Sequence, residues 1–564
     1  MKNCENRFRA IVVLLQTKTE KTDNKMKNTN PIFSLKNFRS FGEDGADFEL
    51  APITVLTGCN SAGKSSLVKA LMLMSDQTTG PNVVKGILDN NRLQPSTILK
   101  TTSSELKLGG FTSVINDQMP DGRLTLSYRI WSDYLQEEVV CKRTYRKKNG
   151  VLNEGGLSEL IIEKTDGAVI YKATPGTYLE SFNFGGQFEE REIEHIDEEE
   201  HFDLIKDNYR RFVLACLYAE YSDNIANLQR LSKKTEKTLR EIEKNKQRLE
   251  EMTERFGSDL PKAYEERNID GWNSRTWNCL FHSSALERNY IKNRTDEERE
   301  NDNQELFVTL VINEILSPWF LKSMTSIDSA TNEIQRTYNV ESHDKFSKLL
   351  NALLNAFIQA QFSSTYKSGT FTNKWLQRFH IGDSIEIVGT DEGLGVKAFL
   401  EKNGKKMLLA DEGYGITQLI SILLQIELVI KIHRKYDEMN DKFYNMPHVI
   451  CIEEPEVHLH PQYQSWLAEM FVEAYQNHDT HFIIETHSEY LIRKLQVLVA
   501  DKKNSLQSDD VSLNYVEKNE EGVSHNRQIK IKEDGRLSEP FGEGFYEEAD
   551  TLAMELMKFK TRRK

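Results

Sequence analysis

The chain has few cysteines, and they form no pattern that binds a metal or builds a disulfide framework. The six cysteines among 564 residues stand at positions 4, 59, 141, 216, 279 and 451, with no Cys-x-x-Cys pair. Structural zinc sites and small disulfide-rich folds both need closely spaced cysteines. The sequence therefore argues against both and predicts a reducing, cytoplasmic setting.

Long apolar runs are missing as well. The run at residues 10–15 is far shorter than the roughly 20 residues that span a bilayer, and no small-residue cleavage site follows it. We therefore predict no membrane segment. Residues 1–29 are interpreted as an N-terminal extension, which is either disordered or untranslated if synthesis starts at Met26.

An excess of positive charge is the third absence. The net charge is −14, whereas proteins that coat nucleic acid carry clustered Lys and Arg. A local groove for nucleic acid stays open as an alternative, and the basic cluster at residues 141–148 is its one candidate. That cluster lies in strand-like sequence before Asn149-Gly150, which favours a charged hairpin.

One glycine-rich segment, Gly58-Cys-Asn-Ser-Ala-Gly-Lys-Ser65, fits G-x-x-x-x-G-K-S. An apolar run precedes it and a helix-like run follows, as a phosphate-binding loop requires. Its backbone N–H groups and the helix N-terminus would face one anion. Lys64 is placed to reach the β- and γ-phosphates of ATP, and the Ser65 hydroxyl to ligate Mg²⁺. The alternative is a chance turn; the predicted nucleotide-binding residues are Gly58, Asn60, Ser61, Ala62, Gly63, Lys64, Ser65 and Ser66.

A second strand ends in two carboxylates. Four apolar residues at 449–452 precede Glu453 and Glu454, and Pro455 stops the strand. In a P-loop fold, Glu453 would hold Mg²⁺ directly or through water, and Glu454 would orient or deprotonate the attacking water. The alternative is a solvated acidic pair, against which the apolar run argues.

A third apolar strand, residues 482–484, delivers Thr486, His487 and Ser488 at its C-terminal edge. Ligands bind at that edge in parallel α/β sheets. We interpret His487 as a contact to the γ-phosphate, with a structural histidine as the alternative.

These segments, in this order, resemble ATPases of the ABC clan in its RecF, SMC and OLD (overcoming lysogenization defect) branch, among bacterial AAA-type ATPases found in phage-defence operons. Residues 33–41 are similar to the opening strand of that branch. Residues 453–461 match its E-E-P-E-x-H-L-H-P form of Walker B, and 486–488 its T-H-S switch. Residues 411–418 resemble its signature segment, and 534–548 a short C-terminal module of unknown function.

The resemblance implies an α/β, ABC/RecF-like P-loop ATPase head, and two heads that enclose two nucleotides. The signature of one head then acts on the nucleotide of the other. The usual signature Ser is not obvious, so either Thr417 replaces it or hydrolysis is slow. An ordinary helix N-terminus is the alternative; the residues expected to act in trans are Gly413, Gly415, Thr417 and Gln418.

Changes in hydrophobic period divide the chain. Residues 30–204 carry short alternating runs, such as 124–131 and 160–163, and are expected to form the β-rich N-terminal half of the head. Residues 205–380 are expected to be a helical insertion. Residues 381–500 would supply the signature, Walker B and the His switch, and 501–564 a C-terminal module.

Within the insertion, residues 225–257 carry a heptad pattern that predicts a short coiled coil. Leu228, Thr235, Ile242, Leu249 and Phe256 recur every seven residues, and Gly257 follows them. No matching return arm is visible, unlike the long hairpins of SMC-like proteins. A partner-docking stub and an amphipathic helix packed on its own lobe are left as equal readings.

Other chemistry has little support. His458 and His460 alternate like ligands on one strand face, but they fall in a stretch that the resemblance already explains. OLD nucleases carry a Toprim module after the T-H-S switch, and no such motif follows Ser488. The coupling Gln loop is not placed, with Gln77 a weak candidate.

Three functions remain open. The leading one is an ATP-hydrolysing sensor that dimerises on ATP, or forms a higher even oligomer, and controls a separately encoded effector such as a nuclease in anti-phage defence. The alternative is an ATP-gated scaffold with vestigial hydrolysis. A RecF-like role in DNA repair is third, and the acidic composition disfavours it.

Overall fold

The computed structural model describes residues 30–78, 98–147, 154–201, 308–438 and 447–542, with short gaps inside these ranges and a few isolated positions elsewhere. The N-terminal extension 1–29 and most of the predicted coiled coil 225–257 lie outside the described residues.

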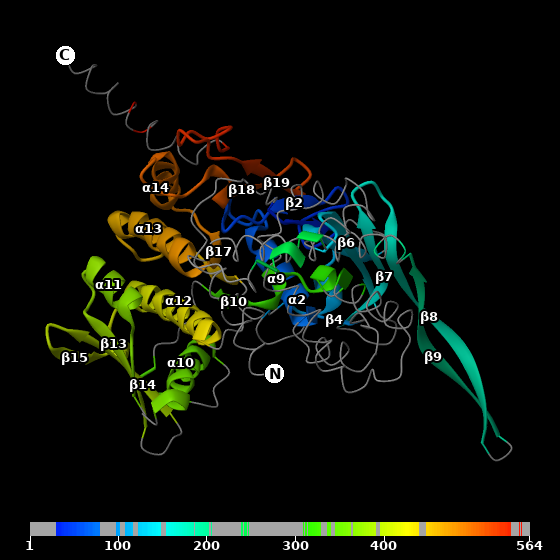
Figure 1. Ribbon diagram of the computed structural model, residues 1–564, viewed down its shortest axis with the longest axis horizontal. Coiled ribbons are helices and arrows are strands. Elements are labelled where there is room, and N and C mark those ends of the chain that lie inside the picture. Colours follow the sequence, from blue (N-terminus) through cyan, green and yellow to red (C-terminus); the bar gives the residue numbers. More distant parts are fainter. Residues whose placement is uncertain are drawn as a thin grey trace.

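The central element is a six-stranded sheet built from distant parts of the chain (Figure 1). Its order is β10 (Met324–Ile327), β16 (His448–Glu453), β17 (Thr480–Glu485), β3 (Ile53–Gly58), β18 (Val511–Lys518) and β19 (Ser524–Ile529). The first five strands are parallel, and β19 returns antiparallel to β18. The P-loop strand thus pairs with β17 on one side and β18 on the other.

Both faces of this sheet are covered, which explains its continuous apolar runs. Alternate residues such as Leu56, Cys451 and Ile483 pack against the N-terminal lobe and α2 (Lys64–Thr78). Their neighbours, such as Val55 and Ile452, pack against helices of the C-terminal half. Those helices are α12 (Tyr414–Glu438), α13 (Pro461–His478) and α14 (Glu489–Ala500).

The N-terminal lobe is β-rich, as the alternating runs predict. Seven of its strands follow the order β2-β1-β5-β6-β7-β8-β9, and β4 pairs with β7. Their bounds are β1 Ile32–Lys36, β2 Ala46–Glu49, β4 Ile98–Lys100, β5 Arg123–Ser132, β6 Glu137–Lys147, β7 Glu154–Lys164, β8 Val169–Phe184 and β9 Gln187–Glu200.

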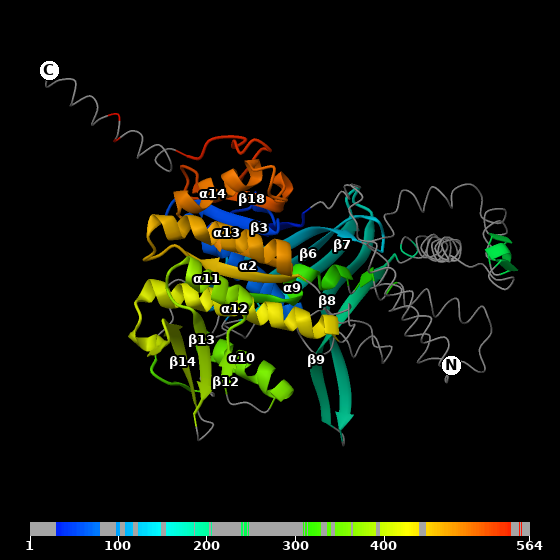
Figure 2. The ribbon, with the colours of Figure 1, turned by 60° about the vertical axis from the view of Figure 1, so that its left-hand side comes forward.

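Strands β8 and β9 continue past the sheet as a two-stranded arm (Figures 1 and 2). Strand β7 pairs with β8 only as far as Ala173, while β8 and β9 pair with each other from Tyr171 to Phe184. Among the described residues no further strand joins them there, so the arm projects from the lobe.

Residues 141–147 of the basic cluster belong to β6, in agreement with their strand-like pattern. Arg143 is 4% exposed and donates to the Leu316 carbonyl at 2.7 Å, and Lys142 pairs with Glu163. Arg143 is therefore engaged inside the lobe, and Lys142 is engaged in an ion pair at its surface.

A second, five-stranded sheet forms the lobe that contains the start of α12. It comprises β11 (Tyr338–Asn339), β12 (Thr365–Lys367), β13 (Ser384–Gly389), β14 (Gly395–Lys402) and β15 (Lys405–Leu408). The region 205–380, whose pattern is helical, thus also contributes β10, β11 and β12. Its described helices are α9 (Trp319–Lys322), α10 (Lys345–Gln361) and α11 (Thr370–Arg378).

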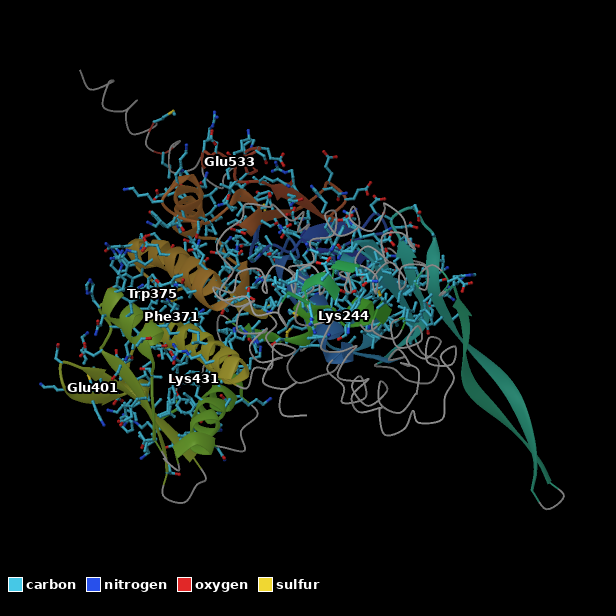
Figure 3. The ribbon with its side chains drawn as sticks, in the orientation of Figure 1. Lys244, Phe371, Trp375, Glu401, Lys431 and Glu533 are labelled. Carbon is cyan, nitrogen blue, oxygen red and sulfur yellow. The ribbon has the colours of Figure 1, made fainter. Side chains whose placement is uncertain are left out.

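Aromatic side chains join this lobe to the central sheet (Figure 3). Phe371 and Trp375 on α11 are buried, and the Phe371 ring lies 5.6 Å from that of His478 on α13. Figure 2 shows α12 running between the central sheet and the strands β13 and β14. Glu427 on α12 is 3% exposed and accepts hydrogen bonds from Gly369 N–H and the Thr372 hydroxyl. These contacts fix α12 between the lobes.

One described helix is long and apolar enough to cross a membrane. Its window, Tyr414–Arg434 of α12, has a mean hydropathy of 1.7, and 78% of it is buried inside the protein. The burial accounts for the apolar composition, because the core helix of a folded domain meets the same criterion.

Candidate functional site

The glycine-rich loop has the backbone that its sequence predicts. Gly58 and Gly63 have φ of 131° and 102°, values that side-chain-bearing residues rarely adopt. A Cβ at Gly58 would lie 2.0 Å from the Val516 carbonyl oxygen, and one at Gly63 would lie 2.5 Å from Ser40 Oγ. Both glycines are therefore required by close packing as well as by conformation. Helix α2 begins at Lys64, so Ser65 and Ser66 stand in its first turn.

The side chain of Lys64 lies over its own loop. Its Nζ donates to the carbonyl oxygens of Gly58 at 3.2 Å and Cys59 at 2.9 Å, and the residue is 5% exposed. Burial lowers the pKa of Lys64, and the nearby carboxylates of Glu485 and Glu454 oppose that shift. The ammonium group thus sits where phosphates would enter the loop.

The Walker B strand brings Glu453 and Glu454 to the same sheet edge. Glu454 has a left-handed φ of 47°, which is uncommon for a residue other than Gly, Asn or Asp. Its amide donates to the carbonyl of Glu485 at 2.7 Å. Burial raises the pKa of Glu453, and the negative charges of Asp328 and Glu485 raise it further. The carboxylate of Asp328, at the end of β10, is therefore part of the same electrostatic environment.

Strand β17 ends between the P-loop strand and the Walker B strand. His487, just after it, is exposed, and its amide donates to Glu456 Oε1 at 2.7 Å. Desolvation lowers the pKa of His487, and Lys64 lowers it further, while Glu454 acts in the opposite direction. The structure therefore brings Lys64, Glu454 and His487 together. Glu456, 9% exposed, holds the turn that places them.

Two further charged residues at this edge were not singled out from the sequence. Glu485, directly before Thr486, lies close to the Ser65 side chain, to Lys64 and to Glu454. Arg39 has φ 54°, and burial lowers its pKa while Glu485 opposes the shift. The only sequence signals were the position of Glu485 beside the T-H-S switch and that of Arg39 inside the opening stretch 33–41.

The C-terminal residues complete the loop's surroundings. Strand β18 pairs with β3 up to Val516 opposite Gly58. Ser524 Oγ donates to the Ala62 carbonyl at 2.5 Å, and Ser524 N–H donates to the Ser40 carbonyl at 2.8 Å. These two hydrogen bonds therefore attach the β18–β19 hairpin to the P-loop and to the neighbouring segment that contains Ser40.

The signature segment lies at the start of α12, on the Walker B side. Gly413 faces open space and Tyr414 is 72% exposed. Thr417 is 1% exposed, and its hydroxyl donates to the Gly413 carbonyl at 3.2 Å. Gln418 is 7% exposed and donates to the Glu454 carbonyl at 3.1 Å. Within this chain, Thr417 and Gln418 point inward, and the helix N-terminus faces outward.

An open, largely apolar groove of about 500 Å³ adjoins that helix start. A Cβ at Gly415 would lie 2.9 Å from the His458 carbonyl oxygen, so this glycine allows α12 to approach the segment after Walker B. The groove is lined by Ile381, Gly413, Tyr414, Gly415, Ile416, His458, Leu459, His460 and Tyr463.

The described residues hold no group of three or more His, Cys, Asp or Glu side chains placed to bind a metal ion. His460 instead caps α13, accepting from Gln462 N–H, and His458 has φ 61° beside Gly415. A magnesium ion at the P-loop would therefore need phosphate oxygens among its ligands. The Ser65 hydroxyl and the Glu453 carboxylate would supply the oxygen ligands that come from the protein.

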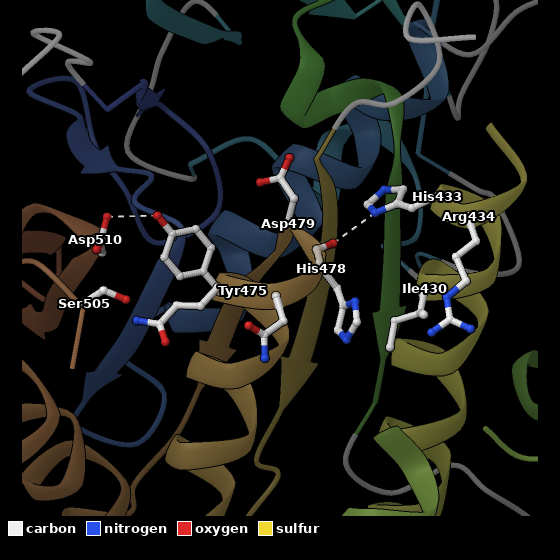
Figure 4. Close-up of a pocket in the computed structure, with 10 residues that line it drawn as sticks. Ile430, His433, Arg434, Tyr475, His478, Asp479, Ser505 and Asp510 are labelled. Atoms are coloured by element: carbon white, nitrogen blue, oxygen red, sulfur yellow. Dashed lines mark hydrogen bonds between the residues drawn. The ribbon is translucent and has the colours of Figure 1, made fainter. Parts of the chain in front are cut away.

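A second pocket, of about 520 Å³, lies at the opposite end of the sheet (Figure 4). It is lined by the C-terminal ends of α12 and α13 and by residues 505 and 510. His433 Nδ1 lies 2.9 Å from the His478 carbonyl oxygen, and Tyr475 donates to Asp510 at 2.9 Å. Helix C-termini carry carbonyl groups and partial negative charge, which disfavours phosphate. The pocket is thus separate from the P-loop in place and in chemistry.

Comparisons with solved structures find SMC head domains at low similarity. One is the Pyrococcus furiosus Smc head domain with an extended coiled coil, bound to the C-terminal domain of ScpA, at 12% identity and TM-score 0.32, covering 93% of this chain and 100% of that chain. Another is the SMC head domain of Thermotoga maritima, at 11% identity and TM-score 0.30, covering 89% and 98%. A search of curated proteins finds no match.

Sequence families give the decisive comparison. A family described only as a protein of unknown function matches residues 506–556, which include β18 and β19. The AAA ATPase domain matches residues 32–492, from β1 through the P-loop, signature and Walker B strand into α14. With its α/β P-loop head and β-rich N-terminal lobe, the chain belongs to the AAA ATPase domain family.

Proposed function

We propose that this protein binds Mg²⁺·ATP in the P-loop, hydrolyses it, and forms a dimer in which two heads enclose two nucleotides. The observation that carries the proposal is the convergence of Lys64, Ser65, Glu454 and His487 at one sheet edge. A phosphate cradle, an acidic residue and an imidazole in this arrangement are what phosphoryl transfer to water requires.

Each residue has a defined part. The amides of residues 60–66 and the N-terminus of α2 bind the phosphate oxygens. Lys64 exchanges its two carbonyl partners for the β- and γ-phosphates. Ser65 and Glu453 hold Mg²⁺, which neutralises phosphate charge when bound. Glu454 accepts the proton of the attacking water, and His487 contacts the γ-phosphate.

The exposed start of α12 supports a signature that acts in trans. A Cβ at Gly413 would meet open space and Tyr414 is 72% exposed, and a helix N-terminus attracts an anion. Gly415 allows the close approach to His458, while Thr417 and Gln418 tie the helix start to its own Walker B end. In this arrangement Thr417 and Gln418 act by positioning, and Gly413 meets the partner's nucleotide.

The biological role rests on the family resemblance alone. The protein would act in the cytoplasm as a sensor that controls a separately encoded effector in anti-phage defence, as a homodimer or a higher even oligomer. The net charge of −14 and the engagement of Arg143 and Lys142 within this chain give nucleic-acid binding little support. A sensor that controls a separate effector, such as a nuclease, is therefore proposed ahead of a DNA-repair role.

One observation favours a second candidate, the ATP-gated scaffold with vestigial hydrolysis. Thr417, the one aliphatic hydroxyl in residues 411–418, is buried and bonded to Gly413. A signature whose threonine hydroxyl is turned away from the partner's nucleotide would hydrolyse slowly.

Steady-state ATP hydrolysis and light scattering distinguish the hydrolysing ATPase from the scaffold with vestigial hydrolysis. Glu454→Gln should abolish turnover and retain an ATP-bound dimer, and Lys64→Ala should abolish nucleotide binding. Glu533→Gln, the same change at an exposed site remote from the loop (Figure 3), is the matched control. Nucleotide binding with no turnover in the wild type would establish the scaffold, and equal turnover in Glu454→Gln and wild type would remove the catalytic role.

A further inference from the structure

Glu485 occupies a central place at the nucleotide-binding edge. It is the last residue of β17, the strand between the P-loop strand and the Walker B strand, and its Cα pairs with Leu56 on one side and Glu453 on the other. The residue is only 7% exposed. Burying a carboxylate is costly unless charges or hydrogen bonds compensate, so its surroundings need an explanation.

The neighbours of Glu485 are those of the phosphate site. The Ser65 hydroxyl and the ammonium groups of Lys64 and Lys69 lie close enough to lower the pKa of this carboxyl group. One of its oxygens, Oε2, is buried and has no hydrogen-bond partner in the structure. A buried acceptor without a partner beside a P-loop suggests that a further donor occupies this space when the site is filled.

The hydroxyl of Ser65 connects this carboxylate to the cation. A serine hydroxyl has one proton and two lone pairs. When the Ser65 hydroxyl donates its hydrogen bond to Glu485, a lone pair on the same oxygen is left for a divalent ion on the opposite side. The unpartnered Oε2 can accept a hydrogen bond from a water ligand of that ion, since Mg²⁺ keeps several waters.

We infer that Glu485 is a positioning residue for the divalent cation of the nucleotide complex, acting through the Ser65 hydroxyl and a cation-bound water. The inference rests on the proposed function and adds to it a second carboxylate beside Glu453. It accounts for the burial of Glu485, for its place beside Ser65 and for its unpartnered oxygen.

Mn²⁺ binding measures this role without turnover. With a non-hydrolysable ATP analogue present, Mn²⁺ titration followed by electron paramagnetic resonance should show affinity reduced by about 10- to 100-fold in Glu485→Ala, the usual cost of losing an outer-shell partner. Affinity for the analogue in EDTA should stay within about twofold of wild type. Glu485→Gln keeps the side-chain volume, and its Mn²⁺ affinity should lie between those of wild type and Glu485→Ala. If Glu485→Ala fails to fold, Glu485→Gln alone should still bind Mn²⁺ more weakly than wild type. Glu533→Gln is the control.

The outcomes are distinct. Unchanged Mn²⁺ affinity in the Glu485 variants would overturn the inference, as would an equal loss of nucleotide affinity in EDTA, which indicates a merely structural role. A wild-type protein that binds no nucleotide under either condition would overturn the proposed function itself, and the inference with it.

Discussion

The main-chain amide of Glu454 donates a hydrogen bond of 2.7 Å to the carbonyl oxygen of Glu485. This bond joins the ends of β16 and β17 just beyond their last paired residues, Glu453 and Glu485. It accompanies the left-handed backbone of Glu454, with φ of 47°. Such a conformation costs on the order of 1 kcal/mol or more and persists where the surroundings hold it, often at functional sites.

That strain leads to a paired prediction for Glu454→Asn. Asparagine tolerates the left-handed region better than glutamate, so the variant should unfold at the same or a higher temperature than wild type. Its shorter amide cannot act as the base, so ATP turnover should fall by roughly 100-fold or more. Thermal unfolding and steady-state hydrolysis on one preparation check both parts.

The control for that pair is Glu533→Asn, at an exposed position, which should change neither quantity. A strongly destabilised Glu454→Asn protein would show that the side chain, and not the backbone, holds the turn. Full turnover would show that Glu454 is not the base.

The sequence predicts which segments meet, because local motifs carry that information. The P-loop, Glu454 and His487 come to one edge since each follows a recognisable apolar strand. It does not predict what each side chain touches. Thr417 and Gln418 are buried by tertiary contacts, and Glu485 is defined by its distant partner Ser65. Strand β10 is only four residues long in a region of helical pattern, and the pairing of β18 with β3 joins positions more than 450 residues apart.

His448, at the start of the Walker B strand, predicts acid sensitivity. It is 8% exposed, and its ring contacts the hydroxyls of Ser323 at 2.5 Å and Thr325 at 3.2 Å. Burial, with a smaller effect of His433, lowers its pKa from 6.5 to about 4. Because the unfolded chain binds the proton more readily, the stability that this residue contributes is present above pH 6.5 and is lost as the pH falls toward 4.

The expected loss across this interval is at most about 3 kcal/mol of unfolding free energy. Denaturant unfolding of wild type and His448→Gln between pH 7.5 and 4.5 measures it. The variant should be less stable at pH 7.5 yet lose less stability on acidification. Parallel pH profiles would assign the acid sensitivity to other groups. His525→Gln, at an exposed position, is the control.

The hydroxyl of Ser524 predicts a link between the C-terminal hairpin and nucleotide affinity. It donates to the Ala62 carbonyl inside the P-loop at 2.5 Å. A typical hydrogen bond contributes about 0.5–1.5 kcal/mol net, so Ser524→Ala should weaken ATP binding by roughly 2- to 10-fold. Ser524→Thr, which keeps the hydroxyl, should restore affinity, and Ser505→Ala at an exposed position should have no effect. Fluorescence titration with a labelled ATP analogue measures all three.

A loss of affinity in Ser524→Ala that only follows its loss of thermal stability would indicate general loosening of the sheet. Affinity equal to wild type would show that the P-loop keeps its conformation without the hairpin.

Gly413 separates a signature that acts on a partner from an ordinary helix start. A Cβ at this position meets no atom within 4 Å, and its φ is not left-handed, so the monomer should accept a side chain. Gly413→Asp should therefore keep the wild-type unfolding temperature and single-head ATP affinity. In a dimer, its carboxylate would oppose the partner's γ-phosphate in a site of low dielectric, where like charges repel strongly. Light scattering with Mg-ATP should show monomers, and turnover should fall together with dimer formation.

The controls are two further substitutions. Gly413→Ala should reduce dimer formation less than Gly413→Asp, because it adds volume without charge. Lys405→Asp on the exposed β15 strand should dimerise normally. Dimerisation of Gly413→Asp at the wild-type ATP concentration would place the start of α12 outside the interface and leave Gly413 as the turn before a core helix.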